Sequence, residues 1–441
     1  MSKIKVCKFG GTSMADGNTI LRGANIIRSD KNRRYVVVSA PGKRFSGDIK
    51  VTDLLYKCAD AIENGDLSVF QETFEKIRAR FLNIEKELGK DLGLKARLDA
   101  TESDMLAGAG RDYCASRGEY FAGLIMSSVL DYPFVDATEF VRFKEDGTLD
   151  EITFELGEKY LQKYQNAVIP GFYGLGADGK VKTFSRGGGD ISGAIVARSV
   201  KAALYENWTD VSGFYACDPR IVNSPKWMSE LTYQELRELS YMGANVLHSE
   251  SIFPVRTAGI PIRICNTFRP EDEGTYIVRN STRDERETVV TGIAGKRGFT
   301  SITLEKPMMN AEVGFVQKVL SVIERRGISF EHLPSGIDTL SLVIDNEYLK
   351  NVNLKELLDE MASAVKPEKI YAHEDIALVA TVGHGMAKKI DTPSRLFKAL
   401  SDAGINVVMI DQGSGGLNII VGVEGVDYAN CIQSIYNEFF N

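Results

Sequence analysis

The chain has 441 residues, 44% hydrophobic and 26% charged, and since single cores seldom grow beyond about 250 to 300 residues, more than one domain is expected. A formal net charge of -7 argues against a nucleic-acid partner, because such partners usually leave a basic patch. No apolar run reaches the roughly 18 to 20 residues of a membrane span, and the N-terminus lacks the apolar stretch of a signal peptide, so we expect a cytoplasmic protein without a membrane partner.

The first part of the chain alternates short apolar strands with helical patterns. Strands are predicted at 6–9, 35–39, 132–136, 167–169, 204–208 and 262–265. Fully apolar strands of this kind suit a parallel sheet covered on both faces, so the pattern predicts a doubly wound α/β layer. Residues 54–130 are mostly helical in pattern and are expected to cap one edge of the sheet.

The segment Lys8-Phe9-Gly10-Gly11-Thr12-Ser13 follows the first predicted strand and precedes a helix predicted at 18–28. Two glycines let backbone N–H groups approach an anion closely, and the helix dipole adds to the attraction. Lys8 supplies positive charge where a transferred phosphoryl group builds up negative charge. This is not the Walker A pattern, in which the lysine follows the glycines. Taken alone, the segment is also compatible with a plain tight turn.

A second glycine cluster reads Ser185-Arg186-Gly187-Gly188-Gly189-Asp190 and precedes a helix rich in small residues at 191–203. An anion could bind at the start of this helix, and Arg186 could hold a carboxylate by two parallel hydrogen bonds. Asp190 is expected either to pair with Lys8 or to cap the helix. Two such clusters in one domain favour a nucleotide that meets a second anionic substrate.

A third motif runs from Trp208 to Arg220, where a strand enters a loop dense in polar and aromatic side chains. Such a loop suits the base and ribose of a nucleotide. Taken alone, Asp218-Pro219-Arg220 is more typical of a surface turn.

The polar stretch 279–287 contains no apolar residue and is interpreted as a connector, after which the chain shows an internal repeat. The first copy has predicted helices at 313–326 and 354–364 and strands at 328–333, 339–344 and 369–372. The second has strands at 377–382, 406–410 and 417–423 and helices at 393–403 and 427–439. Each copy is predicted to be a ferredoxin-like βαββαβ unit of about 70 residues. The second copy lacks a fourth strand, and an unpaired sheet edge tends to pair with other chains. Residues 301–305 are therefore expected to complete the second copy.

Together these motifs resemble the aspartate kinase family, within the amino acid kinase superfamily, whose signature is Lys-Phe-Gly-Gly-Thr-Ser. The likeness continues in Val38-Ser39-Ala40, Ser116-Arg117-Gly118-Glu119, Gly171-Phe172, 186–190, Trp208-Thr209-Asp210-Val211, Asp218-Pro219-Arg220 and 243–248. The repeat is similar to a tandem pair of ACT domains, so the resemblance covers essentially the whole chain. It implies an α/β/α sandwich with a mostly parallel open sheet over 1–295, and ACT domains over 296–373 and 374–441.

The resemblance also implies roles for single residues. Lys8 would contact the transferring phosphoryl group, and Asp190 would orient Lys8. Aspartate would be held by Ser39, Thr52, Glu119, Phe172 and Arg186, with Glu119 at the α-ammonium group and Arg186 at the α-carboxylate. ATP would be held by Gly10, Gly11, Thr12, Ser13, Gly188, Gly189, Thr209, Asp210, Tyr215 and Arg220. Asn245 departs from the family pattern, because members commonly carry a lysine there as an ATP ligand, and Arg220 or Lys226 is expected to compensate.

In the tail, the turn that contains Met309, Gly314 and Phe315 offers backbone groups to an amino acid carboxylate, and Ser329 and Glu331 could receive its amine. The alternative is that these residues only form a dimer packing surface. The resemblance implies lysine or threonine as the effector, and a homodimer or dimer of dimers through the ACT domains.

The implied reaction is attack of the aspartate side-chain carboxylate on the γ-phosphorus of ATP, the first step toward lysine, threonine and methionine. The nucleophile is already ionised at neutral pH, so positioning and charge neutralisation are the tasks of the protein. Six widely spaced cysteines and four histidines predict no metal site of the protein's own, and Mg²⁺ is expected to arrive with ATP.

Two other functions are compatible with parts of the sequence. The first is another amino acid kinase, acting on glutamate, acetylglutamate, carbamate or UMP, which the tandem tail and the opening motif disfavour. The second is a catalytically inactive amino acid sensor. Only Asn245 supports the sensor, whereas Lys8, Glu119, Arg186 and Asp190 are all present.

Overall fold

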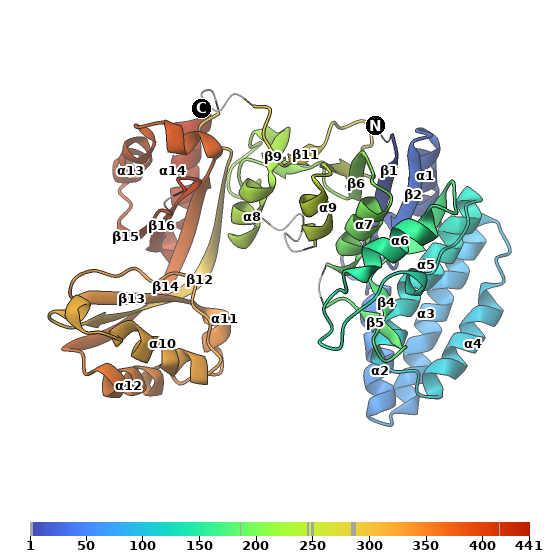
Figure 1. Ribbon diagram of the computed structural model, residues 1–441, viewed down its shortest axis with the longest axis horizontal. Coiled ribbons are helices and arrows are strands. Elements are labelled where there is room, and N and C mark those ends of the chain that lie inside the picture. Colours follow the sequence, from blue (N-terminus) through green and yellow to red (C-terminus); the bar gives the residue numbers. More distant parts are fainter. Residues whose placement is uncertain (1–2, 186, 245–246, 248–250, 284–287, 414) are drawn as a thin grey trace. The chain divides into compact units, whose positions relative to one another are not determined.

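The computed structural model describes residues 3–185, 187–244, 247, 251–283, 288–413 and 415–441 (Figure 1). The chain divides into two compact units. The first comprises Met1–Phe214, Met228–Tyr233 and Val246–Ser281, and the second comprises Tyr215–Trp227, Gln234–Asn245 and Thr282–Asn441. None of the described helices is long and apolar enough to cross a membrane.

Within the described residues, the first unit is built on a seven-stranded sheet with the order β3-β2-β1-β6-β10-β11-β9. The strands are β1 (Lys5–Phe9), β2 (Arg33–Val38), β3 (Ala167–Pro170), β6 (Leu204–Thr209), β9 (Glu230–Thr232), β10 (Ile262–Asn266) and β11 (Thr275–Val278). The five strands from β3 to β10 run parallel, whereas β11 is antiparallel to β10. The predicted class, α/β with a mostly parallel sheet, is confirmed. The strand predicted at 132–136 is reduced to a bridge between Phe134 and Val168.

Helices cover both faces of this sheet. They are α1 (Gly17–Arg28), α2 (Val51–Glu63), α3 (Leu67–Leu88), α4 (Leu94–Leu106), α5 (Arg111–Leu130), α6 (Ile152–Leu161), α7 (Gly188–Ser199) and α9 (Phe253–Ala258). A small hairpin of β4 (Tyr173–Leu175) and β5 (Val181–Thr183) accompanies them. α1 begins with a capping box between Asp16 and Thr19, in which each side chain accepts from the other's backbone N–H.

The helices α2 to α5, blue to cyan in Figure 1, form one core with one face of the sheet. The strand residues in that core alternate along the strands, as the pleat requires: Cys7, Phe9, Val36, Val38, Val168, Trp208 and Cys265. This core also contains residues of α1, and α5 contacts the edge strand β3 and its neighbour β2, which agrees with the expectation that residues 54–130 cap one edge of the sheet. α7 packs against β1, β2 and β6 on the other face.

The second unit contains a five-stranded antiparallel sheet in its described part, with the order β13-β12-β14-β16-β15. The strands are β12 (Gly292–Glu305), β13 (Thr339–Asp345), β14 (Lys369–Val382), β15 (Val407–Asp411) and β16 (Asn418–Glu424). The helices are α8 (Tyr233–Tyr241), α10 (Phe315–Arg325), α11 (Asn346–Leu349), α12 (Leu354–Val365), α13 (Thr392–Asp402) and α14 (Tyr428–Phe440). Two further short strands, β7 (Phe214–Tyr215) and β8 (Trp227–Met228), pair with each other.

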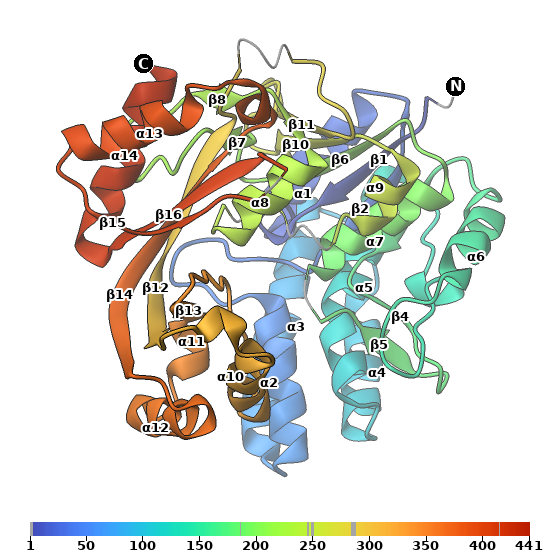
Figure 2. The ribbon, with the colours of Figure 1, turned by 60° about the vertical axis from the view of Figure 1, so that its left-hand side comes forward.

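The two copies of the repeat share β12 and β14. Figure 2 shows both as long strands, with α10 and α12 beside one end and α13 and α14 beside the other. Residues 301–305 pair with 369–373 and with β13, whereas 292–297 pair with 377–382. The second copy is therefore completed by 292–297 and not by 301–305, because β12 continues from one copy into the other with a register shift next to Gly298. The strand predicted at 328–333 is reduced to a single bridge between His332 and Val343.

Candidate active site

Lys8 on β1 points toward the start of α7. Its Nζ lies 2.6 Å from Asp190 Oδ1, and both side chains are largely buried. The N-cap of α7 is Gly187, and no side chain caps this helix. Of the two roles that the sequence left open for Asp190, the structure shows the pairing with Lys8.

The Lys8 ammonium group lies between the backbones of the two glycine clusters. A Cβ atom on Gly10 would lie 3.7 Å from Lys8 Nζ, and one on Gly189 would lie 3.8 Å from it. The Cβ on Gly189 would also lie 2.7 Å from Ser39 Oγ. The two glycines thus leave the approach to the ammonium group open, next to the first turn of α7. Backbone N–H groups and the helix dipole favour an anion at such a place.

Glu119 of α5 is fully buried, and within the described part of the chain its Oε2 atom has no hydrogen-bond partner. Burial raises the pKa of Glu119 to about 8, although a hydrogen bond with the Ala40 backbone and the charge of Lys8 act in the opposite direction. A buried polar atom without a partner is uncommon and calls for a ligand or water. A cationic group bound at Glu119 would satisfy this oxygen.

Ser39, Thr52 and Arg186 are also expected at the aspartate. Ser39 follows β2, and its backbone N–H donates to Phe9 O over 3.1 Å. Thr52 is the second residue of α2 and is half-buried. Arg186 lies outside the described residues.

Phe172 has a backbone φ of 77°, a left-handed conformation that costs on the order of 1 kcal/mol for a residue with a Cβ. Its N–H donates to Ser192 Oγ over 2.9 Å. A Cβ on Gly188 would lie 2.3 Å from the Phe172 ring. These contacts hold the ring against the second glycine cluster.

The residues expected at ATP are divided between the two units. In the first, Thr12 is half-buried, whereas the Ser13 hydroxyl is buried and lies 2.7 Å from Thr267 Oγ1. Thr209 ends β6, and its hydroxyl donates to Asp210 Oδ1 over 3.2 Å. The side chain of Ser13 is therefore bonded within the fold, and its backbone is what remains for a phosphate.

Tyr215 and Arg220 belong to the second unit. Arg220 is exposed and pairs with Asp218 over 2.6 Å. This agrees with a surface turn at 218–220, the alternative that the sequence left open. Asn245 lies outside the described residues.

The residues expected at an effector lie in the first copy of the repeat. Gly314 is the N-cap of α10 with a φ of 82°. The side chains of Met309 and Phe315 are buried in the core, so only their backbone can contact a ligand. Ser329 is exposed, and the Glu331 carboxylate accepts a hydrogen bond from the Tyr241 hydroxyl of α8. Burial raises the pKa of Glu331.

Two residues beside the site were missed from the sequence. Asn207 Nδ2 donates to Asp190 Oδ1 over 3.0 Å, and Asn207 Oδ1 lies 3.5 Å from Lys8 Nζ. An amide within the strand predicted at 204–208 was the signal that could have revealed it.

The second missed residue, Arg80 of α3, is buried, and its guanidinium donates to the carbonyl oxygens of Ala15 and Gly42 and to the Asp48 carboxylate over 3.2, 2.5 and 2.7 Å. It ties the loop after β1 to the loop after β2. An arginine on the apolar face of a helix was the available signal.

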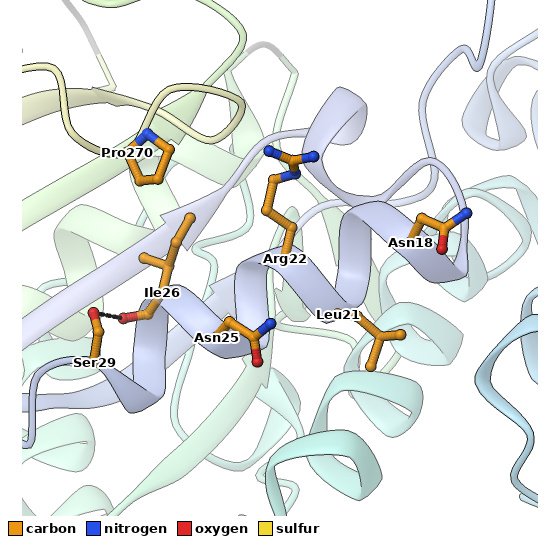
Figure 3. Close-up of a pocket in the computed structure, with 7 residues that line it drawn as sticks. All are labelled: Asn18, Leu21, Arg22, Asn25, Ile26, Ser29 and Pro270. Atoms are coloured by element: carbon orange, nitrogen blue, oxygen red, sulfur yellow. Dashed lines mark hydrogen bonds between the residues drawn. The ribbon is translucent and has the colours of Figure 1, made fainter.

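A surface hollow on α1 contains none of these residues (Figure 3). It is lined by Asn18, Leu21, Arg22, Asn25, Ile26, Ser29 and Pro270. The Ser29 hydroxyl donates to Ile26 O over 2.8 Å, so this side chain is already bonded within α1.

The chain is similar to known proteins over its whole length. Residues 3–266 match the model of the amino acid kinase family, and residues 379–439 match an ACT domain model. The chain is 37% identical to aspartokinase 3 of Bacillus subtilis, with 99% of both chains covered, and 29% identical to the lysine-sensitive aspartokinase 3 of Escherichia coli, with 100% of both covered. The solved aspartate kinase of Clostridium acetobutylicum is similar with a TM-score of 0.92 at 47% identity, over 99% of both chains. Escherichia coli aspartokinase III in complex with lysine and aspartate has a TM-score of 0.79 at 26% identity, over 100% of both chains.

Proposed function

Since this chain belongs to the aspartate kinases of the amino acid kinase family and carries ACT regulatory domains, we propose which residues carry phosphoryl transfer from ATP to L-aspartate. The observation that carries the proposal is the Lys8–Asp190 pair, 2.6 Å long, between the glycines Gly10 and Gly189. The ammonium group neutralises charge on the γ-phosphoryl group as it transfers.

In the proposed reaction, a side-chain carboxylate oxygen of aspartate bonds to the γ-phosphorus while the bond from that phosphorus to the bridging oxygen breaks. The electron pair leaves with ADP, and the product is the acyl phosphate 4-phospho-L-aspartate. An aspartate carboxylate is ionised at neutral pH, so no residue is needed to remove a proton. Lys8 acts by charge and position alone.

For aspartate, we assign the α-ammonium group to Glu119 and the α-carboxylate to Arg186, with Ser39, Thr52 and Phe172 beside them. The orphaned Oε2 of Glu119 supports the first assignment, because a buried carboxylate gains most from a cationic partner. Escherichia coli aspartokinase III has been solved with aspartate and ADP, at 26% identity and a TM-score of 0.77.

For ATP, we assign the phosphates to the backbone of 10–13 and 188–189, and the nucleoside to Thr209, Asp210, Tyr215 and Arg220. The described residues contain no group of three His, Cys, Asp or Glu side chains that could hold an ion. A magnesium ion bound with ATP would keep most of its ligands from phosphate and water. When bound, the ion supplies positive charge to the β- and γ-phosphates.

For regulation, we assign an amino acid effector to Gly314, Ser329 and Glu331 and to the backbone of Met309 and Phe315. A relative at 29% identity is named lysine-sensitive, which favours lysine over threonine. Domain boundaries after 295 and 373, a homodimer through the ACT domains and a cytoplasmic location stay predictions.

The test is replacement of Lys8 by alanine, with ADP release followed in the presence of aspartate. Turnover is expected to fall at least 100-fold while the thermal unfolding temperature changes little. Lys5→Ala is the matched control, because Lys5 lies on the same strand and pairs with Asp30 and Glu206. Near-normal turnover of Lys8→Ala would refute the assignment.

A further inference from the structure

The strand β6 places two polar side chains on the face that carries Lys8. In the parallel register of β1 and β6, Lys8 is paired with Asn207. Residues two apart on a strand share a face, so Tyr205 lies on this face as well. Both Tyr205 and Asn207 are buried.

These two side chains hold Asp190 at two different points. The Tyr205 hydroxyl donates to the backbone carbonyl oxygen of Asp190 over 3.1 Å. Asn207 Nδ2 donates to Asp190 Oδ1 over 3.0 Å, the same oxygen that lies 2.6 Å from Lys8 Nζ. Tyr205 therefore fixes the first turn of α7, and Asn207 fixes the carboxylate itself.

An amide suits this position for an electrostatic reason. Asn207 offers a donor to Asp190 and, through Oδ1 at 3.5 Å, an acceptor to Lys8, yet it adds no charge. A carboxylate in its place would add negative charge beside Lys8, and an apolar side chain would leave Asp190 free to rotate. The ammonium group is therefore oriented without being neutralised further.

We propose that Asn207 is a positioning residue that orients the Lys8–Asp190 pair for phosphoryl transfer. This inference rests on the proposed role of Lys8. Asn207 itself acts through Lys8 and Asp190, so its loss should lower kcat more than it changes the KM for aspartate.

Two variants separate this role from a merely structural one. Asn207→Leu removes both hydrogen bonds, and its kcat is expected to fall about tenfold at every pH, with the KM for aspartate within about twofold of wild type. Asn207→Asp puts two carboxylates about 3 Å apart, so one of them binds a proton more readily than usual. The protonated group again donates to its neighbour. The kcat of Asn207→Asp relative to wild type is therefore low at pH 8.5 and rises as the pH is lowered to 6.

The measurement is kcat and the KM for aspartate from pH 6 to 8.5 for wild type, both variants and Lys8→Ala. Thr153→Val is the control for loss of a buried polar side chain, because Thr153 is buried and bonded to the Arg142 backbone. A kcat of Asn207→Leu within about twofold of wild type would overturn the inference. So would a ratio of the Asn207→Asp kcat to the wild-type kcat that does not change with pH. If Lys8→Ala is inactive in that case, the proposed role of Lys8 stands and only this inference fails. If Lys8→Ala is active, both fail.

Discussion

The backbone N–H of Gly42 donates to the carbonyl oxygen of Gly11 over 2.8 Å. The two loops that follow the neighbouring parallel strands β1 and β2 are thereby joined at the carboxyl edge of the sheet, where ligands of such folds bind. A Cβ on Gly42 would lie 2.5 Å from the Gly11 carbonyl carbon, so the loops meet without room for a side chain.

Gly42→Ala is therefore expected to separate the two loops. The free energy of unfolding should fall by about 1–3 kcal/mol, as for other overpacked sites. Turnover should fall roughly 100-fold, because a displacement near 1 Å at the site has that effect. Gly47→Ala in the same loop is the control, since a Cβ there would meet the Phe45 ring only at 3.8 Å. Urea unfolding and ADP release check both variants, and equal behaviour of the two would contradict the prediction.

Arg80→Met tests the tie between the same loops from the side of α3. This substitution removes the hydrogen-bond donors to Ala15 O and Gly42 O. The Asp48 carboxylate keeps its ion pair with Arg44, whose Nε lies 2.8 Å from Asp48 Oδ2. We expect the free energy of unfolding to fall by about 3 kcal/mol, because buried acceptors lose their partners.

Arg78→Met is the matched control for Arg80→Met on the same helix. Its partners Glu75 and Asp99 are exposed and its partner Glu102 is partly exposed, so the loss should be smaller than for Arg80→Met, about 1 kcal/mol. Urea unfolding of the two variants makes the comparison. A loss for Arg80→Met no larger than that for Arg78→Met would show that the tie is not needed.

The raised pKa of Glu119, about 8, predicts that aspartate binding depends on pH. Below pH 8 the free enzyme holds a proton on Glu119 that the α-ammonium group must displace, so the KM for aspartate should fall as the pH rises from 6 to 8.5. The dependence approaches tenfold per pH unit well below pH 8. Glu119→Gln should bind aspartate weakly with a flat pH profile. A wild-type KM that is independent of pH in this range would contradict the assignment.

The raised pKa of Glu119 also makes the stability of the ligand-free protein depend on pH. The pKa of Glu119 in the folded protein lies above the usual value of 4.5. The contribution of Glu119 to the free energy of unfolding is therefore fully present below pH 4.5 and is lost as the pH rises through about 8. Glu119→Gln should therefore be more stable than wild type at pH 8.5 and closer to it at pH 6, as thermal unfolding without aspartate would show.

Sequence reasoning reached Lys8 and Asp190 because glycines around a lysine leave a chemical pattern along the chain. It also placed most strands, because buried parallel strands are continuous apolar runs. It failed where the outcome depended on tertiary pairing. Nothing in the composition of 292–305 tells that one strand serves both copies of the repeat, because this depends on the two different segments of β14 with which its halves pair.

Asn207 and Arg80 were not predicted from the sequence for a related reason. Each is a polar residue that the fold buries, and local pattern rules do not reveal its burial. Only the fold shows that the carboxylate of Asp190 and the carbonyl oxygens of the two loops lie within reach of them. Buried polar groups of this kind require partners, and the partners are distant in sequence.

The Glu331 carboxylate accepts a hydrogen bond from the Tyr241 hydroxyl. If the amine of a lysine effector binds this carboxylate, Glu331→Gln removes the charge, and the lysine concentration for half inhibition should rise at least about tenfold. Tyr241→Phe should lower that concentration, because the amine no longer competes with the hydroxyl. Turnover without lysine should stay within about twofold of wild type in both variants.

Glu347→Gln is the control for this pair, since Glu347 is exposed on α11 in the same copy and pairs with Lys350. Inhibition curves of ADP release against lysine concentration provide the measurement. Opposite shifts for Glu331→Gln and Tyr241→Phe would distinguish direct binding at Glu331 from a general loosening of the regulatory sheet, which would shift both in one direction. Unchanged inhibition in Glu331→Gln would place the effector elsewhere.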